Sequence, residues 1–477
     1  MAPRATAPRT GAPATPVGAS REPRDMSAPR RDFTVAGLAH TLVTADRDAP
    51  VVLIRTPYGR HHHFAEADAW ARRGFSCAVG DVRGRHGSTG GFRPYRQEAV
   101  DGAAVVDALR RLGFHRVIAA GSSYAAYCAV TAAIARPDAV VGVLAAVPAL
   151  GLGETAREPG GAARLACRVG WWGEHAATPV SADLARTPVL DLVSGWDDLW
   201  AAPERTAELW RALPRLGMPL LAVGGLLDPF AADTEELARR WGGPTRLVLG
   251  PWAHELDARD PGAALAGRRV GALYLAWARA LDRLRGDKVF YAVDGWRRHT
   301  DAATAVELEV VAGRFHADPA RPFRSVPLGA PITDDPGAVL LTPPLPAGEL
   351  RGGAVLALDA VADAPDADWV ARLSLDGVHL AHAVTRSAHE PGVPREVTLR
   401  LPPVGLAVPE GARLRVEVAG HHWPRHARNP HTGQDPVRAA VLLPSHREVR
   451  RARALLPWHP AGAGAVPAAA LPEEIAS

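Results

Sequence analysis

Short apolar runs alternate with longer helical patterns through the first half of the chain. Val51–Ile54 and Val117–Ala120 are continuous apolar runs, as expected of parallel strands that are covered on both faces. Similar runs are Phe75–Val79, Val140–Ala146, Leu220–Val223 and Leu247–Leu249. Helical patterns occupy Val100–Leu112, Ala125–Ala135, Thr234–Trp241 and, as a long closing helix, Gly267–Arg285. This alternation predicts an α/β domain with a mostly parallel sheet.

The pattern changes near residue 287 to strict alternation of apolar and polar positions. In Val397–Leu401 the apolar residues fall on one face of a strand, and Leu414, Val416 and Val418 repeat this arrangement. Runs of period two with Gly and Pro between them predict an antiparallel β-sandwich. The shift at Arg285–Asp287 marks the predicted domain boundary.

The two ends of the chain differ from both domains. Residues 1–32 contain mainly Ala, Pro, Arg and Thr, which bury too little apolar surface to offset the loss of chain entropy. Residues 460–477 are similarly rich in Ala and Pro. We therefore expect a disordered N-terminal tail over 1–32, an α/β domain over 33–287, a β-sandwich over 288–459 and a loose C-terminal tail over 460–477.

Composition narrows the function classes. Of the 477 residues 47% are apolar and 22% are charged, a globular balance, and none of the apolar runs approaches the roughly 20 residues of a membrane helix. The net charge is +4, of which residues 1–32 supply +3 with six arginines and three acids. The remainder is nearly neutral, which is unsuited to a phosphate backbone. We expect neither membrane insertion nor nucleic-acid binding.

Cysteine spacing and the N-terminal arginines bear on location. Cys77, Cys128 and Cys167 are far apart in sequence, so they predict neither a disulfide framework nor a zinc cluster, and reduced thiols are expected. Arg30-Arg31 could belong to a twin-arginine export signal, but no long apolar core follows it. A cytoplasmic location is therefore favoured over export.

Two motifs suggest a metal or a cofactor, and neither has the pattern that such a site needs. His61–His63 are consecutive, so their side chains cannot all converge on one ion, and a solvated loop is expected instead. Gly84, Gly87 and Gly90 lack the spacing of a dinucleotide-binding loop. We expect no metal and no cofactor.

The most informative local motif joins a strand to a helix. The run Val117–Ala120 ends in Gly121-Ser122-Ser123 and passes directly into an Ala-rich helix, the context of a nucleophile elbow. Small residues at Gly121 and Ala125 allow close approach of the two backbones, although the strict motif has Gly where Ala125 stands. The alternative is that the two serines cap the helix. The motif alone does not choose between these interpretations.

A serine nucleophile needs a base and an acid that follow later sheet strands in the order Ser, Asp, His. Asp228 follows the run Leu220–Val223, and His254 follows the next run, Leu247–Leu249. In such a triad His254 accepts the serine proton and Asp228 orients the imidazole. Asp197 and Asp198 are rival acids, but a further helical segment separates them from the strand, so Asp228 is preferred.

These segments together resemble the CocE/NonD hydrolases, the group that contains cocaine esterase, the X-Pro dipeptidyl-peptidases of family S15 and the α-amino acid ester hydrolases. The matching segments are Arg55–Tyr58, Asp81–Gly90, Gly121–Tyr124, Asp197–Trp200, Gly250–His254 and Trp423–Gly433. The resemblance implies an α/β-hydrolase fold with a helical cap, followed by a jelly-roll, galactose-binding-like sandwich.

The resemblance also implies individual roles. Ser123 matches the nucleophile, Asp228 the acid and His254 the base. Tyr58 matches a tyrosine whose hydroxyl forms an oxyanion hole with the backbone N–H of Tyr124, since a tetrahedral oxyanion needs two fixed donors. Without the resemblance, Tyr58 would be interpreted as an ordinary aromatic residue at a strand end.

Several departures from the family pattern affect specificity. Ala126 stands where the family usually has Gly, and Gly225-Leu226-Leu227-Asp228 lacks the usual Trp. Only residues 151–187 are available for the cap, so pocket specificity cannot be transferred from the family. Ala125 and Ala126 rather than an acid follow Tyr124, which weakens the amino-acid-ester interpretation.

Aromatic residues flank the proposed site and are candidates for an apolar acyl pocket. They are Trp171, Trp172, Trp196, Trp200, Trp252 and Phe230. The alternative for each one is ordinary packing between the cap and the sheet.

The sequence therefore predicts a serine hydrolase that is independent of metals and cofactors and acts on a small ester or amide through an acyl-enzyme. Two alternatives stay open: an acyl or aminoacyl transferase with the same triad, and a carbohydrate-binding protein whose hydrolase domain is a relic. Exposed sandwich edges are compatible with a monomer or a homodimer.

Overall fold

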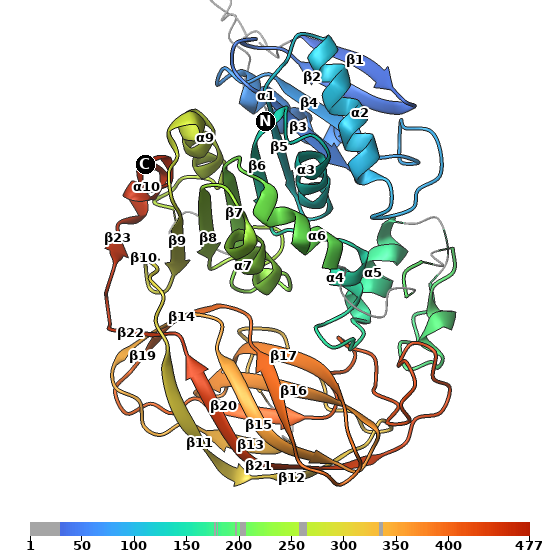
Figure 1. The fold of residues 1–477 in the computed structure, drawn as a ribbon, viewed down its shortest axis with the longest axis vertical. Helices are drawn as coiled ribbons and strands as arrows, with labels where there is room; N and C mark the ends of the chain where they lie inside the picture. The colour runs from blue at the N-terminus through green and yellow to red at the C-terminus, as the bar shows by residue number, and fades with distance from the viewer. Residues whose placement is uncertain are drawn as a thin grey trace, which may run out of the picture.

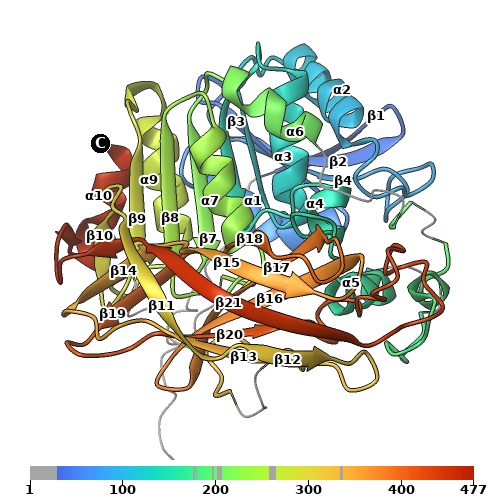
Figure 2. The ribbon, with the colours of Figure 1, turned by 60° about the horizontal axis from the view of Figure 1, so that its bottom comes forward.

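The computed structural model describes residues 29–175, 178, 180–195, 198–200, 207–256, 265–332 and 337–477. Figure 1 shows an α/β domain above a β-sandwich, with the segment that carries α4 and α5 beside the sandwich. Figure 2 shows the same arrangement from a second direction. Within these ranges none of the helices combines the length and the apolar character that crossing a membrane requires.

The α/β domain contains an eleven-stranded sheet in the order β1-β2-β4-β3-β5-β6-β7-β8-β9-β10-β23. The strands are β1 Arg30–Val35, β2 Leu38–Val43, β3 Val51–Thr56, β4 Cys77–Asp81, β5 Val117–Ser122, β6 Val140–Ala146, β7 Leu220–Gly225, β8 Thr245–Gly250, β9 Lys288–Ala292, β10 Trp296–Arg298 and β23 Ala465–Val466. The strands from β4 to β9 pair in parallel, whereas β1, β2, β10 and β23 pair antiparallel at the edges. The predicted parallel sheet is confirmed.

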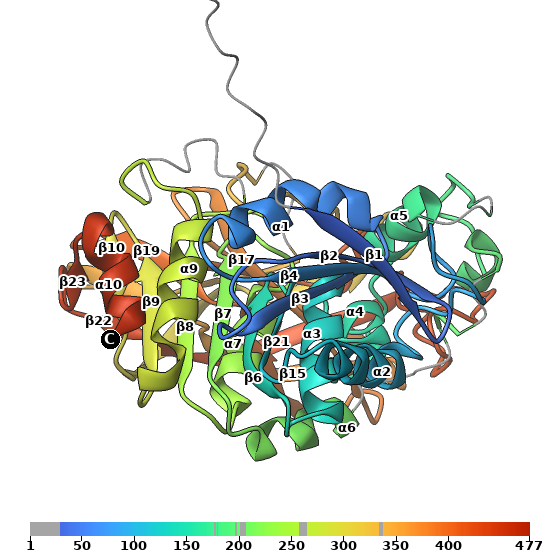
Figure 3. The ribbon, with the colours of Figure 1, turned by 90° about the horizontal axis from the view of Figure 1, so that it is seen from above.

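Helices cover both faces of this sheet (Figure 3). They are α1 Phe64–Ala71, α2 Glu98–Arg111, α3 Tyr124–Ala135, α6 Ala207–Ala212, α7 Ala231–Arg240, α9 Gly271–Ala280 and α10 Leu471–Ala476. One core lies beneath α2, α3, α6 and α7, and the other beneath α1, α9 and α10. In β5, Val117 and Ala119 face the first core, and Ile118 and Ala120 face the second. A strand buried on both faces explains the continuous apolar runs.

The C-terminal segment is not the loose tail that its composition predicts. Strand β23 pairs with β10, and Leu471 and Ile475 of α10 are fully buried in the core around α9. Arg246 Nε also donates to the carbonyl of Ile475 (3.1 Å). The two apolar residues stand four apart on one helix face, and this spacing outweighs the surrounding Ala and Pro content.

Both predicted domain boundaries shift as well. Residues 1–28 of the predicted N-terminal tail lie outside the described residues, but Arg30–Asp32 belong to β1 and pair with β2. At the other boundary, β9 and β10 remain in the first sheet, so the sandwich begins at Thr304 rather than at 288. β9 pairs with β8 on one side and β10 on the other, and Phe290 and Tyr291 face the two cores of the first domain.

The β-sandwich contains a nine-stranded arrangement in the order β17-β16-β20-β13-β11-β21-β15-β18, with β12 on β21, and a three-stranded sheet β19-β14-β22. Its strands are β11 Thr304–Ala312, β12 Arg314–Ala317, β13 Ala338–Leu341, β14 Gly348–Gly352, β15 Val355–Ala362, β16 Asp366–Leu375, β17 Val378–Ala388, β18 Arg395–Arg400, β19 Val404–Val408, β20 Arg415–Ala419, β21 Ser445–Leu456 and β22 Trp458–His459. One apolar core holds these strands together. The predicted all-β domain is confirmed.

The segment between β6 and β7 forms the cap and contacts the sandwich. It includes α4 Leu152–Ala156 and α5 Ala166–His175, and Leu199 and Trp200 pack in the same apolar cluster, so it extends beyond the predicted range 151–187 before α6 returns to the sheet. The backbone N–H of Leu165 donates to the carbonyl of Arg425 (2.8 Å). Arg157, whose side chain is 1% exposed, forms a two-pronged ion pair with Asp435 at 3.0 and 2.9 Å. These contacts fix the cap against the second domain.

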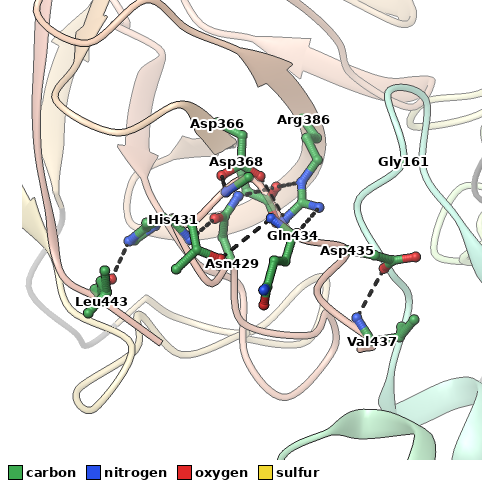
Figure 4. Close-up of polar contacts among 12 residues, drawn as sticks. Gly161, Asp366, Asp368, Arg386, Asn429, His431, Gln434, Asp435, Val437 and Leu443 are labelled. Carbon is green, nitrogen blue, oxygen red and sulfur yellow. Dashed lines mark hydrogen bonds and ion pairs between the residues drawn. The ribbon is translucent and has the colours of Figure 1, made fainter. Parts of the chain in front are cut away.

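The loop that carries Asp435 is anchored inside the sandwich (Figure 4). Asn429 Nδ2 and Arg386 Nε both donate to Asp368 Oδ1, at 2.8 and 2.9 Å. The backbone N–H of His431 donates to Asn429 Oδ1 (2.6 Å). The segment Trp423–Gly433, which resembles the family, therefore holds in place the loop that carries Asp435.

We expect that removing the carboxylate of Asp435 destabilises the protein. Asp435→Ala leaves the buried guanidinium of Arg157 without its counter-ion, and breaking a buried pair costs about 3–5 kcal/mol. Because Asp435 is 26% exposed, we expect a loss of about 2–3 kcal/mol. Urea denaturation of the variant and the wild type measures this loss in the free energy of unfolding.

Asp282→Ala is the matched control, because its pair with Arg116 is exposed on both sides and should contribute under about 1 kcal/mol. Equal losses in the two variants would contradict the docking role of Asp435.

Candidate active site

Ser123 adopts a strained backbone conformation between β5 and α3, with φ 56° and ψ −120°. Such a positive φ is costly for a residue with a side chain and persists only where the surroundings hold it. Its N–H donates to the carbonyl of Ala146 (2.9 Å), and its carbonyl accepts from the N–H groups of Ala126 (3.1 Å) and Ala149 (3.2 Å). These bonds hold the side chain above the carboxyl end of the sheet.

The close approach expected at this turn is present. A Cβ placed on Gly121 would lie 2.3 Å from the carbonyl carbon of Ala125, which leaves room for hydrogen alone. The alternative interpretation, in which a serine caps α3, is wrong, because Ser123 makes no side-chain hydrogen bond to the helix. The geometry is that of a nucleophile elbow.

His254 and Asp228 meet Ser123 from the two neighbouring turns. Asp228 lies in the turn between β7 and α7, and His254 lies beyond the end of β8. The Ser123 hydroxyl donates to His254 Nε2 at 2.9 Å, and His254 Nδ1 donates to Asp228 Oδ1 at 2.9 Å. The Asp228 carboxylate is fully buried, whereas the imidazole is 30% exposed. The arrangement can move a proton from the hydroxyl to the imidazole.

Opposing effects set the pKa values of this pair. Burial lowers the pKa of His254, but the hydrogen bond and the charge of Asp228 outweigh it, so the pKa is raised above 6.5. Burial raises the pKa of the Asp228 carboxyl, and the hydrogen bond to His254 offsets part of that rise. Asp228 therefore increases the basicity of the imidazole.

Two donors converge near the Ser123 hydroxyl. The Tyr58 hydroxyl lies beside Ser123, accepts a hydrogen bond from Trp171 Nε1 (3.1 Å) and has its pKa raised by burial. The N–H of Tyr124 is the first amide of α3, so it has no partner within the helix. The Tyr124 side chain points elsewhere and bonds to Glu98. Its backbone N–H is therefore a second donor next to Ser123, in the arrangement that an oxyanion hole requires.

The segment Asp81–Gly90 positions the loop that carries Tyr58. Asp81 Oδ1 accepts the N–H of Arg60 (2.6 Å), and Asp81 Oδ2 accepts that of Gly87 (3.1 Å). Arg85 Nε donates to the carbonyl of Pro57 (3.0 Å). The resemblance of this segment to the family assigns it no role, and its hydrogen bonds show that it fixes the backbone beside Tyr58.

The predicted pocket aromatics divide into three groups. Trp171 lies parallel to the Tyr124 ring (centroids 6.0 Å apart), and Phe230 lies against His254 (5.4 Å). Trp172 and Trp200 are buried in the apolar cluster of the cap. Trp252 packs instead against Trp296 in the core beneath α9, because the chain turns inward after β8. Trp196 lies outside the described residues.

The competing sequence assignments do not join this site. Asp198 accepts hydrogen bonds from Arg93 (2.9 Å) and Arg96 (3.2 Å) rather than from a histidine, and Asp197 lies outside the described residues. His63 contacts Glu66. Over the ranges that the structure describes, no group of three His, Cys, Asp or Glu side chains is arranged to hold a metal ion.

Comparison with known families matches both domains. Residues 43–255 match the X-Pro dipeptidyl-peptidase (S15) family, and residues 298–455 match the X-Pro dipeptidyl-peptidase C-terminal non-catalytic domain. Together the matches span more than three quarters of the 477 residues. A cocaine esterase from Rhodococcus sp. (strain MB1 Bresler) is 24% identical over 282 residues, which are 48% of each chain. The match thus spans about half the length of this curated relative.

Solved structures share the whole architecture. An aminopeptidase from a marine sediment archaeon, Thaumarchaeota archaeon, superposes with a TM-score of 0.73 at 18% identity, covering 93% of this chain and 99% of its own. An α-amino acid ester hydrolase gives 0.74 at 19% identity, with 92% and 98% covered. A CocE/NonD family hydrolase from Staphylococcus aureus gives 0.60 at 14% identity, with 91% and 97% covered. The shared fold is an α/β-hydrolase domain followed by a β-sandwich.

We expect Asp228→Asn to lower the pKa of His254. The substitution removes the charge that raises this pKa and retains the burial that lowers it, so the imidazole should titrate below 6.5. Titration of the imidazole by ¹H–¹⁵N NMR measures the shift. Asp198→Asn, at an acid paired with Arg93, should leave the pKa of His254 unchanged. An unaltered pKa in Asp228→Asn would refute the coupling.

Proposed function

The chain belongs to the CocE/NonD and S15 group of serine hydrolases, and we propose that it cleaves small ester or amide bonds through an acyl-enzyme on Ser123. The observation that carries the proposal is the continuous relay from the Ser123 hydroxyl through His254 to Asp228, with 2.9 Å at each step. The neighbouring donors of Tyr58 and Tyr124 support it.

The proposed reaction has two halves. Ser123 Oγ attacks the carbonyl carbon while its proton moves to His254 Nε2, and the carbonyl oxygen becomes an anion between the Tyr58 hydroxyl and the Tyr124 N–H. His254 then gives the proton to the leaving group, and the carbon–heteroatom bond breaks. Water enters, loses a proton to His254 and attacks the acyl-enzyme. The acid leaves, and the proton returns to Ser123.

The sandwich contributes to the site by holding the cap. Trp171, which bonds to Tyr58, lies on α5, and α5 begins beside the sandwich contact between Leu165 and Arg425. The intact relay also argues against the alternative in which the hydrolase domain is a relic. The relatives whose names state an activity act on esters and on peptides, so both bond types belong to the proposal.

We expect a fluorophosphonate probe to label Ser123 and no other serine. Ser123→Ala should lose the label and lower hydrolysis of p-nitrophenyl butyrate by about 10⁴-fold or more, because it removes the hydroxyl that donates to His254 Nε2. Mass spectrometry of the adduct and steady-state kinetics measure both effects. Ser122→Ala is the matched control at the adjacent position and should keep both. Labelling at another residue would refute the assignment.

We expect Tyr58→Phe to lower kcat by about 10²–10³-fold with a smaller change in KM, because an oxyanion donor acts mainly in the transition state. Fluorophosphonate labelling should become slower but remain at Ser123. Tyr127→Phe serves as a control, since that hydroxyl bonds to the carbonyl of Tyr95 (3.2 Å). Equal kcat values for wild type and Tyr58→Phe would exclude Tyr58 from the oxyanion hole.

A further inference from the structure

Arg168 on α5 is a buried cation beside the proposed active site. Arg168 is 3% exposed, and its guanidinium carbon lies 5.5 Å from the centre of the Trp171 ring. The same Trp171 donates from Nε1 to the Tyr58 hydroxyl. One indole therefore joins Arg168 to the oxyanion hole.

Arg168 lacks a counter-ion among the described residues. Its Nε and Nη1 atoms are buried without any hydrogen-bond partner. The Tyr95 hydroxyl and the Cys167 thiol act on its guanidinium through both charge and hydrogen bonding, and neither is a carboxylate. A buried guanidinium with unmet donors carries a large desolvation cost. The cation–π contact with the Trp171 ring offsets part of that cost.

Several other buried arginines are balanced by acids, and the fully buried Arg246 instead donates to backbone carbonyls. Arg157 pairs with Asp435, Arg164 with Glu158 and Arg372 with Glu417. Arg447 also has unpaired nitrogens, but the charges of three aspartates, Asp363, Asp366 and Asp368, act on it. Arg168 differs because no such acid is present beside it in the described part of the chain.

The electrostatic field of the site favours an anion. Both pKa values are raised overall, at Tyr58 by burial and at His254 by Asp228. The charge of Arg168 acts in the opposite direction on each, so Arg168 lies within electrostatic reach of the two groups. Arg425 of the sandwich, held near Asp228, adds a second positive charge. The positions after Tyr124 are the buried residues Ala125 and Ala126, which cannot balance a cationic substrate.

We propose that the substrate carries a carboxylate, in its acyl part or in its leaving group, and that this carboxylate binds the guanidinium of Arg168 as its missing counter-ion. The inference rests on the proposed function, because it concerns the substrate that Ser123 attacks. Arg168 is thus a residue that determines specificity and takes no part in proton transfer. An arginine fork matches the two oxygens of a carboxylate.

Two pairs of esters test the proposal and separate the two positions of the charge. The acyl pair is mono-p-nitrophenyl adipate and its neutral methyl ester. The leaving-group pair is 4-carboxyphenyl butyrate and 4-carbamoylphenyl butyrate. We expect wild type to prefer the charged member of one pair, and that pair identifies the part of the substrate that meets Arg168. No preference for the charged member in either pair would overturn the inference.

Variants at Arg168 give the second measurement. Arg168→Gln should lower kcat/KM for the preferred charged ester by about 10–10²-fold, the value of a hydrogen bond to a charged group, and change the neutral ester less than about threefold. Arg168→Lys should keep part of the preference. Arg168→Gln should not lower the urea midpoint, because it removes an unpaired buried charge. An equal loss on charged and neutral esters would assign Arg168 a structural role instead.

Failure of the proposed function would look different. If Ser123 neither takes the fluorophosphonate label nor turns over the neutral esters, the hydrolase proposal fails. Calorimetry then still tests Arg168: adipate should bind Ser123→Ala about tenfold more tightly than it binds Ser123→Ala with Arg168→Gln, and adipamide should bind both alike. Equal affinities of adipate for the two proteins would overturn the carboxylate site.

Discussion

The strained backbone at Ser123 is the constraint on which the rest of the site depends. A positive φ at a residue with a side chain is held by hydrogen bonds to Ala146, Ala126 and Ala149, and by the close approach of Gly121 to α3. The same turn aims the Oγ atom outward and leaves the first amide of α3 without a helical partner. One local geometry thus presents both the Ser123 hydroxyl and a free helical N–H, the two groups that the proposed reaction uses.

The parallel strands bring Asp228 and His254 to the edge of the sheet at which Ser123 lies. Because the strands from β3 to β9 run in parallel, the turns after β5, β7 and β8 all lie at their carboxyl ends. Asp228 and His254 therefore need only short turns to reach Ser123. The fully buried carboxylate of Asp228 sits behind the imidazole of His254, which is 30% exposed, so the pair is ordered from core to surface.

The sequence was most informative where one physical requirement dominates. Strands buried on both faces must be apolar throughout, so the sheet was predictable, and the helix expected over Val100–Leu112 lies at Glu98–Arg111. The three residues of the relay followed from strand order. A local sequence pattern does not encode the direction in which a side chain leaves a turn. For this reason the sequence makes Trp252 a pocket candidate, although its side chain lies in the core. The burial of Arg168 could not be predicted, because an arginine on a helix is usually solvated and the sequence does not show which residues surround it.

The return of the chain to its first domain has a consequence for synthesis order. The sandwich strands, from β11 to β22, precede β23 and α10, yet these last elements complete the core around α9. The catalytic core is therefore discontinuous, with the sandwich as an insertion within it. The whole inserted domain is therefore synthesised before Leu471 and Ile475 can complete the core around α9, so that core closes later than the turn at Ser123 is made.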